Sequence, residues 1–188
     1  MVDDSKIIKQ TRCWVESVII DLNFCPFAKR EVERGSVHYQ ISRDTVIEQA
    51  LHSLINECER LDENSEIETT LLIFPDAFKK FDDYLDMLEL ANELFVAQGY
   101  EGIYQLASFH PDYCFEGESV HDAANFTNRS PYPMLHLIRE VSLEKVLENY
   151  PEPESIPENN IKLARGKGFS QMKEMLEKCL NGKEDKDV

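Results

Sequence analysis

The feature that most constrains the fold is a pair of strand-like segments separated by one helical pattern. Residues 68–74 read ETTLLIF, and from Leu71 onward both alternate faces are apolar. A strand that is apolar on both faces is typical of the interior of a sheet that is covered on both sides. Residues 76–98 carry apolar side chains at helical spacing, and residues 103–109 are again strand-like. This order predicts a βαβ unit with parallel strands and a right-handed crossover.

The flanking segments extend this unit into a mixed sheet. Residues 36–42, SVHYQIS, alternate apolar and polar side chains as a half-exposed strand does, and a helical pattern follows them. Residues 134–138, MLHLI, are expected to pair antiparallel with residues 103–109, because no clear crossover helix joins the two. Helices are predicted over residues 4–22, after Ser142 as an N-cap, and at the C-terminus. The fold class is therefore α+β with an α/β-like core: a mixed sheet of about four strands, helices packed on it and a helical C-terminal extension.

No Gly/Ser-rich or Pro-rich linker divides the chain, so residues 1–180 are predicted to form one globular domain. The last residues, 181–188, read NGKEDKDV and are predicted to be a disordered charged tail. The 36 acidic and 20 basic residues give a formal net charge of -16. Phosphate backbones and anionic lipid surfaces repel such a chain, so nucleic acid and membrane are not expected as partners. The sequence leaves the oligomeric state open.

The five cysteines stand singly, without a C-x-x-C pair, which suits a reducing compartment. The N-terminus is acidic where a signal peptide would be basic, so a cytoplasmic protein is expected. Cys25 follows the first predicted helix, which Pro26 ends. The negative end of the helix dipole disfavours a thiolate at that position. Two interpretations of Cys25 are open: a small buried residue, or a reactive or ligand-contacting thiol.

The long connection after residue 109 is the candidate functional region, because compact domains rarely keep so long a segment without regular structure unless it is functional. His110 and Asp112 follow the end of a strand, at the edge where open α/β sheets bind ligands. His136 lies within an apolar strand, so it is either a satisfied core residue or a neighbour of His110 at one polar cavity. His110, His136 and Asp112 are the candidate catalytic residues.

Several polar residues in the same region have the chemistry to hold an anion. Asp122, Asn125 and Asn128 recur at a spacing of three, and Arg129 follows directly. A guanidinium can bind a carboxylate or phosphate bidentately, with carboxamides beside it. The candidate ligand-binding residues are therefore Asp122, Asn125, Asn128, Arg129, Ser130, Cys25 and Arg139. The alternative is that these side chains tie the loop to its own carbonyl groups. The His and Asp spacing matches no specific metal site, so no metal is assigned, and the cofactor is unknown.

Four segments carry a resemblance to a known family: TRCWVESVIIDLNFCPFA, SFHPDY, NFTNRSPYPMLHLIREVS and IPENNI. Over residues 11–168 the chain resembles the bacterial family called domain of unknown function 1415. The resemblance implies a bacterial, cytoplasmic, single-domain protein with the polar stretch as its hallmark. It transfers no activity, cofactor or catalytic residue to this chain.

Two functional hypotheses follow, and whether the protein is an enzyme stays open. The first is an enzyme or ligand-binding protein for a small anionic molecule, with His110, Asp112, Asn125, Asn128, Arg129 and His136 converging on one pocket. The second is a non-catalytic adaptor whose polar stretch braces an interaction surface. An open pocket lined by these residues favours the first hypothesis, and a filled, fully paired network favours the second.

Overall fold

The structure is a computed structural model that describes residues 2–148 and 150–182. Its centre is a four-stranded sheet in the order β1-β2-β4-β3. The strands are β1 (Val37–Ile41), β2 (Thr69–Ile73), β3 (Tyr104–Phe109) and β4 (Met134–Arg139). β1 runs parallel to β2, while β4 runs antiparallel to both β2 and β3. The predicted mixed sheet, the interior position of β2 and the antiparallel pairing of β3 with β4 are confirmed.

The βαβ unit predicted from β2 and β3 takes a split form. The two strands run in the same direction, because both are antiparallel to β4, but β4 lies between them. The directly adjacent parallel pair is β1 and β2, joined through α3. β4 and β2 are thus the two interior strands, and their side chains form the centre of both sheet faces.

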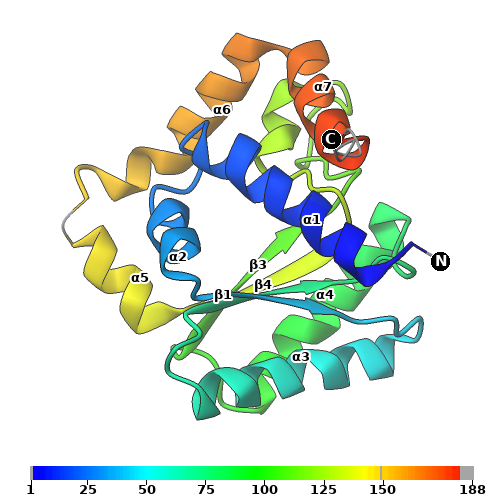
Figure 1. Cartoon of the computed structure of the whole chain (residues 1–188), viewed down its shortest axis with the longest axis vertical. Helices are drawn as coiled ribbons and strands as arrows, with labels where there is room; N and C mark the ends of the chain where they lie inside the picture. The colour runs from blue at the N-terminus through cyan, green and yellow to red at the C-terminus, as the bar shows by residue number, and fades with distance from the viewer. Residues whose placement is uncertain (1, 149, 183–188) are drawn as a thin grey trace, which may run out of the picture.

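Helices cover both faces of the sheet (Figure 1). α3 and α4 pack on one face, against residues such as Leu72, Leu135 and Leu137. α1, a following π-helical segment, α2, α6 and α7 pack on the other, over Leu71, Ile73 and Met134. The helical bounds are α1 (Asp4–Trp14), the π-helix η1 (Val15–Ile20), α2 (Ala28–Arg34), α3 (Ile47–Glu63), α4 (Phe81–Ala97), the 3-10 helix η2 (Ala123–Thr127), α5 (Glu140–Leu147), the 3-10 helix η3 (Pro153–Ser155), α6 (Ile156–Lys167) and α7 (Phe169–Leu180).

Three local expectations need correction. α2 was not expected, because its sequence AKREVER has too few apolar positions to show a helical stripe. α5 begins at Glu140, directly after β4, so Ser142 lies inside the helix and is not its N-cap. The helix predicted over residues 4–22 is α1 continued as a π-helix to Ile20. The predicted disordered tail falls mostly on residues 183–188, which lie outside the described residues.

Candidate ligand-binding cavity

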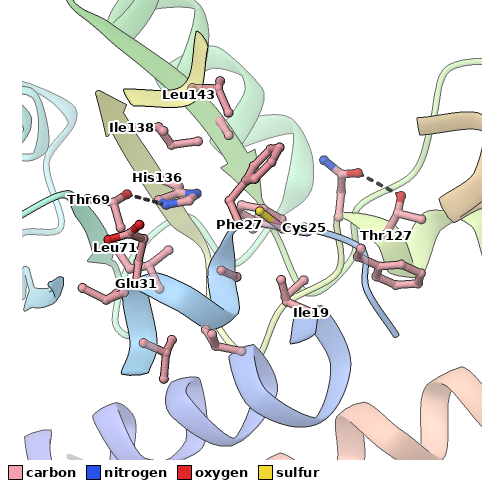
Figure 2. Close-up of a pocket in the computed structure, with 18 of the residues that line it drawn as sticks. Ile19, Cys25, Phe27, Glu31, Thr69, Leu71, Thr127, His136, Ile138 and Leu143 are labelled. Atoms are coloured by element: carbon pink, nitrogen blue, oxygen red, sulfur yellow. Dashed lines mark hydrogen bonds between the residues drawn. The ribbon is translucent and has the colours of Figure 1, made fainter. Parts of the chain in front are cut away.

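A cavity of about 410 Å³ lies between the sheet and the helices of the α1 side (Figure 2). Its floor is the sheet face that carries Leu71, Ala107 and His136, and its roof is formed by η1, α2, α5 and α6. Exposed Pro157 and half-exposed Arg30 belong to its lining, so the cavity reaches the surface between α2 and α6. The remaining lining residues are mainly apolar: Trp14, Val15, Ile19, Phe24, Cys25, Phe27, Ala28, Glu31, Val32, Val37, Glu68, Thr69, Phe109, Phe115, Thr127, Asn128, Ile138, Ser142, Leu143, Val146, Asn160 and Ile161.

The cavity explains an irregular burial pattern on the central strand β4. Met134, Leu135 and Leu137 are completely buried, whereas His136 and Ile138 keep accessible surface. Ala107, the partner of His136 on β3, is also incompletely buried. These side chains lie in the middle of the fold with helices above them. Their residual exposure therefore opens into the cavity.

His136 is the polar centre of the cavity floor, and its hydrogen bonds define its tautomer. Its Nε2 lies 2.6 Å from Oγ1 of Thr69, and the same Oγ1 lies 2.5 Å from the carbonyl oxygen of Leu137. A carbonyl only accepts, so the single hydroxyl proton of Thr69 points to Leu137. Nε2 of His136 must then carry the proton donated to Thr69, which leaves Nδ1 as an acceptor. Burial lowers the pKa of His136 to about 4, so the ring is neutral at pH 7.

Acidic side chains accompany His136 in the lining. Glu31 is buried and accepts hydrogen bonds from Arg30 at 2.6 Å and from the hydroxyl of Ser36 at 2.7 Å. Burial raises the pKa of Glu31, but the combined effect of these hydrogen bonds and of the nearby arginine charges is larger and lowers it. Glu31 is therefore a carboxylate at neutral pH. Glu68 also lines the cavity, and its buried Oε1 has no hydrogen-bond partner among the described residues.

Cys25 lies in the cavity wall beside Phe27 (Figure 2). Burial raises the pKa of its thiol, against the smaller opposing effect of the backbone N–H groups of Phe27 and Ala28. The dipole argument from the preceding helix is incomplete, because Cys25 also lies just before α2, whose N-terminus has the opposite sign. Desolvation nevertheless dominates, so the neutral thiol is the prevailing form at pH 7.

His110 lies on the other face of the sheet. Ala107 pairs with His136 and shares its face, whereas His110 is packed among Phe81 and Tyr84 of α4, with ring centroids 5.1 Å away. Its Nε2 donates to the carbonyl of Phe78 at 2.8 Å, and its Nδ1 accepts from the backbone N–H of Asp112 at 2.9 Å. Burial also lowers the pKa of His110. The expectation that both histidines border one cavity is wrong, because the strand alternation separates them.

The role visible for His110 is to hold a strained turn. Phe78 has a φ of 53°, which is rare for a bulky residue, and its carbonyl receives the His110 hydrogen bond. Asp112 contributes its backbone N–H to the same arrangement. Neither residue belongs to the cavity lining.

Arg129 ties the polar stretch to itself. Its Nε donates to the carbonyl of Tyr113 at 3.0 Å, and its Nη2 donates to the carbonyl of Val120 at 2.9 Å. The guanidinium also lies 4.8 Å from the ring centroid of Phe126. Burial lowers the pKa of Arg129, but the group stays protonated. Two of its five N–H donors are therefore used by carbonyl groups of its own loop.

The neighbouring polar side chains act in the same way. Asn125 accepts from the backbone N–H of Phe115 at 3.0 Å and donates to the carbonyl of Ser119 at 2.9 Å. Asp122 is the N-cap of η2, where its carboxylate accepts from the backbone N–H of Ala124 at 2.8 Å, and it pairs with Arg165 at 2.8 Å. The hydroxyl of Ser130 donates to the carbonyl of Tyr132 at 2.6 Å.

Asn128 and Arg139 differ in where they lie. Asn128 borders the cavity, where its side chain accepts from Thr127 at 2.9 Å and donates to the carbonyl of Ser108 at 3.3 Å. Arg139 is outside the cavity lining and donates to the carbonyl oxygens of Ile67 and Asn64 at 3.1 and 3.2 Å.

Of the ten candidate residues, the cavity brings together Cys25, Asn128 and His136. The other seven, His110, Asp112, Asp122, Asn125, Arg129, Ser130 and Arg139, lie elsewhere. Three residues of the cavity were not predicted from the sequence: Thr69, Glu31 and Glu68. The signal for two of them was present, because residues 68–70 open an otherwise apolar interior strand with polar side chains. Glu31 gave no signal, because its helix was not predicted.

The fold and the cavity define an α+β protein with an open mixed sheet and a recess between one sheet face and its helices. Among the described residues, none of the helices is both long enough and apolar enough to cross a membrane. The family model described as "Protein of unknown function (DUF1415)" matches residues 6–174. The chain therefore belongs to this family, as its sequence resemblance implied. Comparison with curated proteins and with solved structures gives no match.

Proposed function

We propose that this protein binds a small, largely apolar molecule in the cavity between the sheet and helices α2, α5 and α6. The observation that carries the proposal is a recess of about 410 Å³ whose lining is mainly hydrocarbon, with a hydrogen-bonded polar pair, His136 and Thr69, on its floor. Ligand sites are typically concave and apolar, with a few polar groups that orient the ligand. The volume lies within the range of about 300–1,000 Å³ that is common for such sites.

The energetic argument concerns the cost of leaving such a space empty. The apolar side chains that line a recess of about 410 Å³ lack the packing partners that a filled core gives them, and an unfilled apolar space costs stability. Water reaching the cavity from its mouth would meet mostly hydrocarbon and find few hydrogen-bond partners. An apolar occupant removes much of this cost, which supports binding.

The small anion expected from the sequence finds less support. Arg129 and Asn125 make hydrogen bonds within their own loop, and the cavity instead carries Glu31 and Glu68. These contacts within the loop support the interpretation of the polar stretch as a structural brace. The ligand-binding hypothesis nevertheless stands, because a separate cavity supports it. Within residues 2–148 and 150–182, no specific contact favours an adaptor.

Binding is better supported than proton transfer. A histidine with a pKa near 4 is neutral at pH 7 and only weakly basic, whereas an efficient general base has a pKa near the working pH. Cys25 likewise stays a neutral thiol. We also keep a bacterial origin and a cytoplasmic location within the proposal, since five free cysteines suit a reducing compartment. The net charge of -16 continues to disfavour nucleic acid as a partner.

A cavity-filling substitution tests the proposal. Ala107→Phe places a ring on the cavity floor beside His136, and Ala97→Phe adds the same ring at an exposed position of α4. 1-Octanol serves as the probe, with binding measured by amide chemical shifts in NMR titrations. We expect saturable binding to the wild type and to Ala97→Phe. For Ala107→Phe the dissociation constant should be at least about tenfold higher, which corresponds to a loss of about 1.4 kcal/mol of binding free energy. Equal binding to all three proteins would contradict a site in this cavity.

A further inference from the structure

We infer that the polar end of the cavity's ligand is a neutral hydrogen-bond donor, a hydroxyl or an amide N–H, that binds Nδ1 of His136. This inference rests on the proposed function and specifies the chemistry of the ligand. It departs from the carboxylate or phosphate that the sequence favoured.

The first step is the fixed tautomer of His136. The hydroxyl of Thr69 is committed to the carbonyl of Leu137, so it offers Nε2 of His136 only a lone pair. Nε2 therefore keeps the proton. A neutral imidazole has one donor and one acceptor nitrogen, so Nδ1 is the acceptor.

The second step is the position of Nδ1. The imidazole lies on the cavity floor, with Thr69 at one nitrogen and the other nitrogen directed towards the space below Phe27 (Figure 2). Among the described residues, none donates a hydrogen bond to Nδ1 of His136. The accessible surface of His136 opens into the cavity, so an occupant of the cavity can donate the hydrogen bond that Nδ1 lacks.

The third step excludes charged head groups. A carboxylate or phosphate has only acceptor oxygens, so it cannot donate a hydrogen bond to Nδ1 and its lone pairs would repel the lone pair of Nδ1. The cavity also already contains the acidic side chains Glu31 and Glu68. The one cationic side chain in the described lining, Arg30, donates to Glu31 at 2.6 Å. An ammonium group at Nδ1 would have to lose its hydration in a mainly apolar lining, and since both oxygens of Glu31 already accept from Arg30 and Ser36, Glu68 alone would be left to offset that cost. A neutral donor meets none of these costs.

Three probes built on a chain of eight carbons, counting the carboxyl carbon of the acid, test the head group: 1-octanol, its methyl ether and octanoate. The ether lacks the donor, and octanoate replaces it with a negative charge. In NMR titrations of the full chain, the alcohol is expected to bind about tenfold more tightly than the ether, as one neutral hydrogen bond allows. Octanoate is expected to bind more weakly than the alcohol at pH 7.

Two variants assign this preference to Nδ1. His136→Gln retains an amide that can reach Thr69 but has no atom in place of Nδ1, so the alcohol and the ether should bind about equally. His136→Asn keeps an amide oxygen near the position of Nδ1, so much of the preference for the alcohol should remain. Circular dichroism establishes that both variants fold. In the wild type, ¹⁵N spectra of the imidazole should show an unprotonated Nδ1 whose resonance moves when 1-octanol binds.

The outcomes separate the two proposals. Equal affinity for the alcohol and the ether in the wild type, or tightest binding of octanoate, would overturn the inference about the head group and leave the cavity as a binding site. A protonated Nδ1 in the free protein would also overturn it. Absence of binding by all three probes would overturn the proposed function, and the inference with it.

Discussion

At the scale of single residues, the positions of His110 and His136 show that alternation along a strand determines on which face of the sheet a side chain lies. The sequence places both in strand-like surroundings, but the pairing of Ala107 with His136 puts the two rings on opposite faces of the sheet. His110 has both nitrogens engaged by Phe78 and Asp112, whereas His136 has one nitrogen engaged by Thr69. The two histidines therefore differ in whether the second ring nitrogen has a hydrogen-bond partner, and a sequence pattern does not reveal that difference.

The lowered pKa of His136 predicts a pH dependence of stability. Its folded-state pKa of about 4 lies below the ordinary histidine pKa of 6.5, so below pH 6.5 the unfolded chain binds the proton more readily. The free energy of unfolding should therefore fall as the pH is lowered from 6.5 to 4, with His136 contributing about 3 kcal/mol. Urea denaturation of the wild type and of His136→Asn across this range measures the contribution.

The comparison of His136→Asn with the wild type is internally controlled, because every other titrating group, including His110, is present in both proteins. The difference in stability between His136→Asn and the wild type should shift in favour of the variant as the pH falls. Parallel curves for the two proteins would show that His136 is not desolvated in the fold.

At the scale of elements, helix existence was predictable where an apolar stripe was long. α3 and α4 carry such stripes over 17 residues each, and both were predicted. α2 has seven residues and one strongly apolar position, Val32, so it is stabilised by its tertiary surroundings and by Gly35, whose φ of 70° ends it. Because α2 forms part of the cavity roof, missing it also meant missing Glu31 and misjudging the surroundings of Cys25.

The packing of α7 on α1 gives a prediction about cysteines. Sγ of Cys13 lies 3.0 Å from Sγ of Cys179, and both cysteines are free thiols in the structure. Diamide, which accepts two hydrogens when two thiols join, should therefore form a Cys13–Cys179 disulfide in the folded protein. Peptide mapping by mass spectrometry should find this cross-link, and Cys179→Ser should not form it. Preferential pairing of other cysteines would contradict the arrangement of α1 and α7.

At the scale of the whole molecule, the sequence predicted the layers better than the site. The α+β class, the four strands and the interior place of β2 follow from local periodicity, because each strand's burial leaves a pattern in its own residues. The insertion of β4 between β2 and β3 does not follow from local periodicity, because strand order depends on long-range pairing. The cavity depends on that order and on how α2, α5 and α6 leave space above His136. No local pattern encodes such a space.

A crystal structure of the protein soaked with 1-octanol would show whether the space above His136 holds a small molecule. The account predicts density for the alkyl chain between the sheet and α2, with the hydroxyl oxygen about 2.8 Å from Nδ1 of His136, as expected for a hydrogen bond. A cavity closed by the lining side chains, or one that holds only water after soaking, would contradict it.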